Sequence, residues 1–189
     1  MWQTNEFAGE HDGRPAAVLD DGSEPKPLIH DVGSGADFHT STDWWDYDGT
    51  LGSPRATRVR AACSCGWRGE QSYPIDWDVD EELLPVSLDT GGPQDDWQEH
   101  IAGIEAGAVP LPAGLQELLV QVDAELEKLT DCDPLAALRA VAVPERCIAR
   151  TAGTAAYHLM QDQVPDDRIA AGLGISPGKV LGRMLRYRS

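Results

Sequence analysis

DDRIAAGLGISPGKVLGRMLRYR, residues 166–188, predicts two short helices joined by a tight turn, and the rest of the C-terminal part is interpreted around it. Gly174 stands where a positive φ is expected, a conformation that glycine adopts at little cost. Ser176 and Pro177 suit the N-cap and the first position of the second helix. Apolar side chains are expected to pack the two helices together: Ile169, Leu173, Ile175, Val180, Leu181, Met184 and Leu185.

Basic residues recur on another side of the second helix. Lys179, Arg183 and Arg186 are spaced by four and three residues, so they share one helical face. From Arg168 onward the chain carries five basic residues and no Asp or Glu, although its formal net charge is −17. Affinity for nucleic acid comes largely from Lys and Arg. The C-terminal end is therefore suited to a polyanion in spite of the acidic whole.

The pair Ala170 and Gly174 resembles the helix-turn-helix motif, in which a small residue of the first helix precedes the turn glycine by four positions. The resemblance covers residues 166–188 and extends loosely back to Leu135, where the chain is similar to actinobacterial helix-turn-helix domains. It departs from that family at Arg183, where an apolar residue is usual. The resemblance implies a second helix in the major groove of double-stranded DNA. The residues expected to contact DNA are Ser176, Gly178, Lys179, Arg183, Arg186 and Arg188.

Two other interpretations of this stretch stay open. It also suits a helical hairpin within a bundle, or a helix-turn-helix that contacts protein instead of DNA. Lys179 and Arg183 could read guanine edges or hold phosphates.

The preceding residues are expected to be helical, so residues 114–189 form one domain after a Pro-containing linker at 107–113. Apolar residues spaced by four and three predict an amphipathic helix over 115–129, which could form a homodimer or pack onto the helix-turn-helix. Asp133 and Pro134 predict the start of a second helix that ends at Val141. Pro144 predicts the start of a third helix that ends at Gln163.

The N-terminal half is predicted to hold a disordered arm and a small domain. Residues 1–36 are rich in Gly, Pro, Asp and Glu and show no apolar period, which predicts a disordered acidic arm. Residues 37–106 hold most of the tryptophans and predict an aromatic-rich module. Its expected elements are strands at 57–63 and 68–74 and a helix at 93–105.

The sequence ACSCGW, residues 62–67, resembles the zinc knuckles of zinc-ribbon proteins, although those more often place two residues between the cysteines. A structural Zn²⁺ takes four N or S ligands, so Cys63 and Cys65 need two more. His39 and His100 are the candidates, because one precedes the strands and the other lies on the helix after them. The alternative is that both cysteines are small apolar residues and both histidines are solvated.

These patterns together predict an α+β protein with a zinc-ribbon-like hairpin and helix followed by an all-helical helix-turn-helix domain. The expected function is a sequence-specific, DNA-binding transcriptional regulator whose acidic module meets a ligand or protein partner. The alternative is an adaptor that contacts the transcription apparatus. No phosphate-binding loop, dinucleotide turn or nucleophile elbow occurs, so we do not expect an enzyme. Without an apolar run of about 20 residues or a signal peptide, we expect a cytoplasmic chain with reduced thiols and no membrane partner.

Overall fold

The computed structural model describes residues 1–4, 6–7, 9–31, 38–78 and 89–188. The chain divides into two compact units, Met1–Ala106 and Gly107–Ser189. Every strand among the described residues belongs to the first unit and the second unit is helical, which confirms the predicted α+β class. The two units are described separately below.

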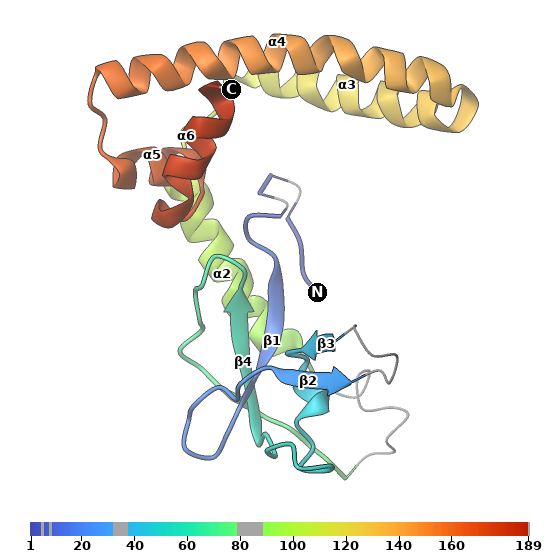
Figure 1. The fold of residues 1–189 in the computed structure, drawn as a ribbon, viewed down its shortest axis with the longest axis vertical. Helices are drawn as coiled ribbons and strands as arrows, with labels where there is room; N and C mark the ends of the chain where they lie inside the picture. The colour runs from blue at the N-terminus through green and yellow to red at the C-terminus, as the bar shows by residue number, and fades with distance from the viewer. Residues whose placement is uncertain (5, 8, 32–37, 79–88, 189) are drawn as a thin grey trace. The chain divides into compact units, whose positions relative to one another are not determined.

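Unit 1 is built around a three-stranded antiparallel sheet in the order β1-β4-β5 (Figure 1). Its strands are β1 (Gly13–Val18), β4 (Arg58–Cys63) and β5 (Tyr73–Pro74). A second, two-stranded antiparallel sheet pairs β2 (Leu28–Asp31) with β3 (Phe38–Ser41). A short 3-10 helix, η1 (Trp44–Asp46), follows β3, and α2 (Gly91–Gly107) ends the unit.

Strand β1 corrects the prediction that residues 1–36 form a disordered arm. It pairs with β4 along its whole length, from Gly13 opposite Cys63 to Val18 opposite Arg58. Ala16, Ala17 and Val18 are buried in succession, so no alternating pattern marks the strand in the sequence. Its partner lies 40 to 50 residues away, and this non-local pairing supplies the burial that the local composition does not indicate.

The expected strands at 57–63 and 68–74 are found in part, and the expected helix at 93–105 is confirmed within α2. Only Tyr73 and Pro74 of the second strand form β5, while Arg68 makes an isolated bridge to Ala62. Buried side chains form two core clusters. One contains Ala17, Trp44, Tyr47, Ala56 and Val59, and the other contains Ala61, Cys63, Trp97 and Ile101.

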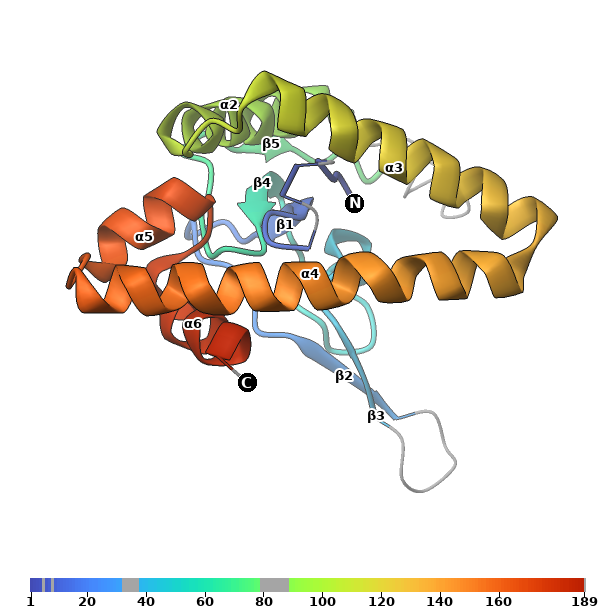
Figure 2. The same ribbon diagram turned by 90° about the horizontal axis from the view of Figure 1, so that it is seen from above.

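Unit 2 contains α3 (Ala113–Cys132), α4 (Pro134–Gln161), α5 (Asp166–Leu173), the 3-10 turn η3 (Pro177–Lys179) and α6 (Val180–Arg188). Helices α3 and α4 meet at Asp133, whose side chain caps α4 by accepting a hydrogen bond of 3.1 Å from the Ala136 N–H. From this loop the two helices diverge (Figure 2). No residue of α3 is fully buried.

The predicted break between Val141 and Pro144 is wrong, because α4 runs through it without interruption. Pro144 removes one backbone donor from the helix interior. The residues on both sides include several good helix formers, among them Ala and Arg, and the helix continues past the lost hydrogen bond.

The core of unit 2 joins α4, α5 and α6. Its buried residues are Ala156, Ile169, Ala170, Ile175, Val180 and Met184. Gly174 ends α5 in the left-handed region with φ 59°, as the sequence predicts. Leu181 and Leu185, expected to be buried, are 67% and 57% exposed. The buried side of α6 instead runs from Val180 through Met184 to the half-buried Tyr187.

Candidate functional site

Two histidines and two cysteines of unit 1 converge on one point. The ligand atoms of His11, Cys63, Cys65 and His100 all lie within 4.8 Å of one another. Cys63 Sγ is 3.5 Å from His11 Nδ1, and Cys65 Sγ is 3.5 Å from His100 Nε2. The cluster therefore pairs each sulfur with one imidazole nitrogen.

The two cysteines are placed by a tight turn at the end of β4. The Cys63 N–H donates to the Trp67 carbonyl at 3.0 Å, and the Gly66 N–H donates to the Cys63 carbonyl at 3.0 Å. Gly66 has φ 99°, which glycine adopts without strain. The Trp67 N–H points at Cys65 Sγ from 3.4 Å.

His11 is held against this turn by hydrogen bonds between Ser64 and the two neighbours of His11 in the chain. The Ser64 N–H donates to the Asp12 carbonyl at 2.9 Å, and the Asp12 N–H donates to Ser64 Oγ at 3.0 Å. The Ser64 hydroxyl in turn donates to the Glu10 carbonyl at 3.0 Å. His11 lies between these residues, and only 3% of its surface is exposed.

His100 reaches the cluster from α2. Its ring stacks on Trp67, with ring centroids 4.2 Å apart and planes 5° from parallel. Burial, together with the nearby His11, lowers the pKa of His100 to about 4. The imidazole is therefore neutral near pH 7, which is the form that binds a metal ion.

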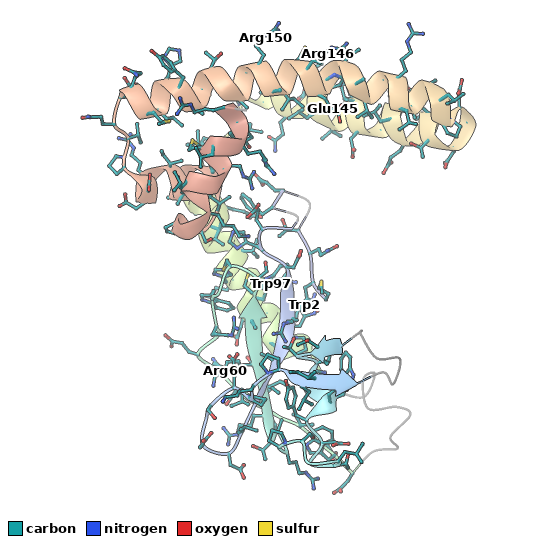
Figure 3. All side chains as sticks on the ribbon, viewed as in Figure 1. Trp2, Arg60, Trp97, Glu145, Arg146 and Arg150 are labelled. Carbon is teal, nitrogen blue, oxygen red and sulfur yellow. The ribbon has the colours of Figure 1, made fainter. Side chains whose placement is uncertain are left out.

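Trp97 packs beside the cluster, next to Trp2 with ring centroids 5.9 Å apart (Figure 3). Burial raises the pKa of the Cys63 thiol. The Trp97 indole N–H is buried and has no acceptor at hydrogen-bond distance within the described residues. The raised pKa of Cys63 favours the neutral thiol when no metal ion is bound, and a bound cation would favour the thiolate.

The arrangement fits a tetrahedral metal ion. With Zn–S bonds of about 2.3 Å and Zn–N bonds of about 2.0–2.1 Å, adjacent sulfur and nitrogen ligands are about 3.5 Å apart. The two measured sulfur–nitrogen distances agree with this separation. The four residues could hold one metal ion.

Three of the four residues expected from the sequence belong to this cluster: Cys63, Cys65 and His100. The fourth member of the cluster is His11, which was not among the expected ligands. The backbone of His39 lies in β3 opposite His30, and its side chain is outside the described residues. His11 lies within residues 1–36, which were expected to be disordered, and it was therefore not among the candidates. His11 stands two residues before Gly13, and Gly13 pairs with Cys63. If β1 had been predicted, this pairing would have indicated that His11 lies near Cys63.

The residues expected to contact DNA lie on η3, α6 and the turn before them. Gly178, Lys179, Arg186 and Arg188 are exposed, whereas Ser176 and Arg183 are half-buried. Arg183 donates to the Tyr187 hydroxyl at 3.3 Å, which lowers the pKa of that hydroxyl. Arg183 and Arg186 both lie over the Tyr187 ring, at 6.0 and 5.7 Å from its centroid. Tyr187 thus orients two of the six side chains.

Comparison with protein-family models, with curated proteins and with solved structures finds no significant match to this chain. Among the described helices, none combines the length and the apolar character needed to cross a bilayer.

Proposed function

We propose that unit 1 binds one Zn²⁺ ion as a structural element. The observation that carries this proposal is the pair of 3.5 Å sulfur–nitrogen distances, one for each cysteine. Two thiolates and two imidazoles form a Cys₂His₂ donor set, which is typical of zinc. Four protein ligands leave no position for a reacting water, so the ion would stabilise the fold and would not act in catalysis.

The test is metal analysis of the purified chain together with matched cysteine variants. We expect about one zinc per chain in the wild type, and much less in Cys63→Ser and Cys65→Ser. Cys147→Ser is the control, since this free cysteine is exposed on α4 and outside the cluster. A wild type that retains no metal after purification with zinc, and whose melting temperature zinc does not raise, would remove the proposal.

We propose further that unit 2 binds double-stranded DNA and that the protein is a sequence-specific regulator of transcription. Support comes from the turn at Gly174, from the core that joins α5 to α6, and from the basic residues of α6 outside that core. The charge distribution agrees with this. Residues 107–189 contain nine Lys and Arg against ten Asp and Glu, whereas residues 1–106 contain six against 22.

Fluorescence anisotropy with a mixed-sequence duplex tests DNA binding by the full chain. We expect the double variant Lys179→Ala/Arg183→Ala to bind less tightly and with a flatter salt dependence, because phosphate contacts release counterions. The control Arg55→Ala/Arg58→Ala removes the same charge from exposed positions of unit 1. Absence of wild-type binding at low salt, with the metal loaded, would contradict the proposal.

A second candidate function is an adaptor that contacts protein through α3. Leu115, Leu118, Leu119 and Val122 share one face of this helix and are between 45% and 58% exposed. The same face continues to Leu126 and Leu129, which are half-buried near the loop to α4. If the protein that binds this face is a second copy of the chain, the resulting dimer would also suit a regulator that binds two DNA half-sites. Sedimentation velocity of the wild type and of Leu118→Lys distinguishes a dimer from a monomer.

A further inference from the structure

Three arginines form a line along α4 that the expected DNA-binding residues do not include. Arg139, Arg146 and Arg150 are spaced by seven and four residues, so they lie on one helical face. The line spans about 16 Å at 1.5 Å per residue. Figure 3 shows Arg146 and Arg150 on the same side of the helix. All three side chains are exposed.

Within the described part of the chain, these three guanidinium groups make no ion pair or hydrogen bond. Ion pairs found there join Arg68 to Glu24 and Lys128 to Glu125. Glu145 is the single acidic residue of α4. A chain with 32 acidic and 15 basic residues thus keeps three cations in line without a partner of its own. Such a surface is suited to an external anion.

The line continues onto α6 through a shared groove. A cavity of about 820 Å³ lies between α4 and the end of α6, and its lining includes Arg150, Arg186 and Arg188, one carboxylate at Glu145, and Gly153 and Tyr157. A Cβ at Gly153 would lie 2.9 Å from the Tyr187 carbonyl oxygen, so this glycine lets α6 approach α4 closely. Arg150 therefore belongs both to the α4 line and to the arginines of α6.

We propose that Arg139, Arg146 and Arg150 form, with Arg186 and Arg188, a phosphate-binding surface for the backbone of double-stranded DNA. This inference rests on the proposed DNA binding by unit 2. A compact anion needs converging donors, whereas these cations are spread along a line. DNA presents about one negative charge per 1.7 Å of its axis, so a polymeric anion matches the line. The surface adds affinity without reading sequence.

The test is a salt titration of the zinc-loaded full chain on a mixed-sequence duplex. A plot of log K against log salt concentration has a negative slope. Each lost phosphate contact reduces the magnitude of this slope by about 0.9. We expect Arg139→Ala/Arg146→Ala/Arg150→Ala to flatten this slope by about two to three units and to weaken binding at low salt. The control Lys26→Ala/Arg55→Ala/Arg58→Ala removes equal charge from unit 1 and should leave the slope within about half a unit of the wild type.

The outcomes separate this inference from the proposal that it rests on. A wild type that does not bind DNA overturns both. A triple α4 variant with an unchanged slope overturns the phosphate surface, while loss of binding in Lys179→Ala/Arg183→Ala still supports α6. A triple variant that binds DNA more tightly than the wild type also overturns it. Circular dichroism checks that each variant keeps its helices.

Discussion

Gly13 lies opposite Cys63 at the end of the β1–β4 ladder, and this pairing brings His11 to the two cysteines. The position also has little room. A Cβ on Gly13 would lie 2.6 Å from the ring of Trp97, which is buried in the core beside Cys63. Gly13 therefore aligns His11 with the two cysteines and leaves room for the tryptophan that packs behind them.

We expect Gly13→Ala to destabilise unit 1 by about 1–3 kcal/mol, because a rigid buried indole must move to make room. Chemical denaturation followed by tryptophan fluorescence measures this change. Gly103→Ala is the matched control, since a Cβ there meets nothing within 4 Å inside α2, and it should stabilise the chain by about 1 kcal/mol. Equal denaturation midpoints for Gly13→Ala and the wild type would show that Trp97 is not fixed.

Ser64→Ala should weaken zinc binding although Ser64 is not a ligand. Its hydroxyl donates to the Glu10 carbonyl and accepts from the Asp12 N–H, so it fixes the residues on both sides of His11. Removal of such a supporting hydrogen bond typically lowers metal affinity about 10- to 100-fold. Competition with a chromogenic chelator measures the affinity. Ser53→Ala, which removes a hydroxyl bonded to Asp48, is the control and should leave it unchanged.

Removal of zinc should unfold unit 1 in preference to unit 2. The four ligands come from the loop before β1, the end of β4 and α2, so without the ion these segments lose a shared contact. We expect a chelator to lower the melting temperature of unit 1 by at least about 10 °C. The readout is tryptophan fluorescence, because all six tryptophans belong to unit 1. Identical melting curves with and without chelator would contradict a structural ion.

Local signals in the sequence were sufficient for parts of both units. Ser176 and Pro177 occupy the N-cap and first turn of η3, and Asp133 caps α4, as their residue types predict. The spacing of Trp97 and Ile101 on one helical face predicted the helix that carries His100, and α2 confirms it. Each of these features depends on residues within a few positions of one another.

The errors arose where distant contacts decide the structure. Strand β1 shows no alternation of apolar and polar residues, because its pairing with β4 buries it. Since this strand was not predicted, His11 just before it was not predicted to join the cluster. Pro144 predicts a helix start from its own chemistry, but α4 continues through it. Leu185 is exposed because Tyr187 extends the buried side of α6 in its place. Burial of an amphipathic helix is set by the surface that it meets, which its own sequence does not specify.

The turn between α5 and α6 can be tested through its glycine. Gly174 has φ 59°, where a Cβ adds about 1–2 kcal/mol of strain, so Gly174→Ala should destabilise unit 2 by about that amount. Gly182→Ala is the control within α6: a Cβ there meets nothing within 4 Å, and alanine should stabilise the helix by about 1 kcal/mol. Thermal unfolding followed by circular dichroism at 222 nm reports both changes, since far-ultraviolet dichroism reports helix content and unit 2 is helical. If Gly174→Ala melted at or above the temperature of the wild type, the left-handed turn that orients α6 against α5 would not be required for this fold.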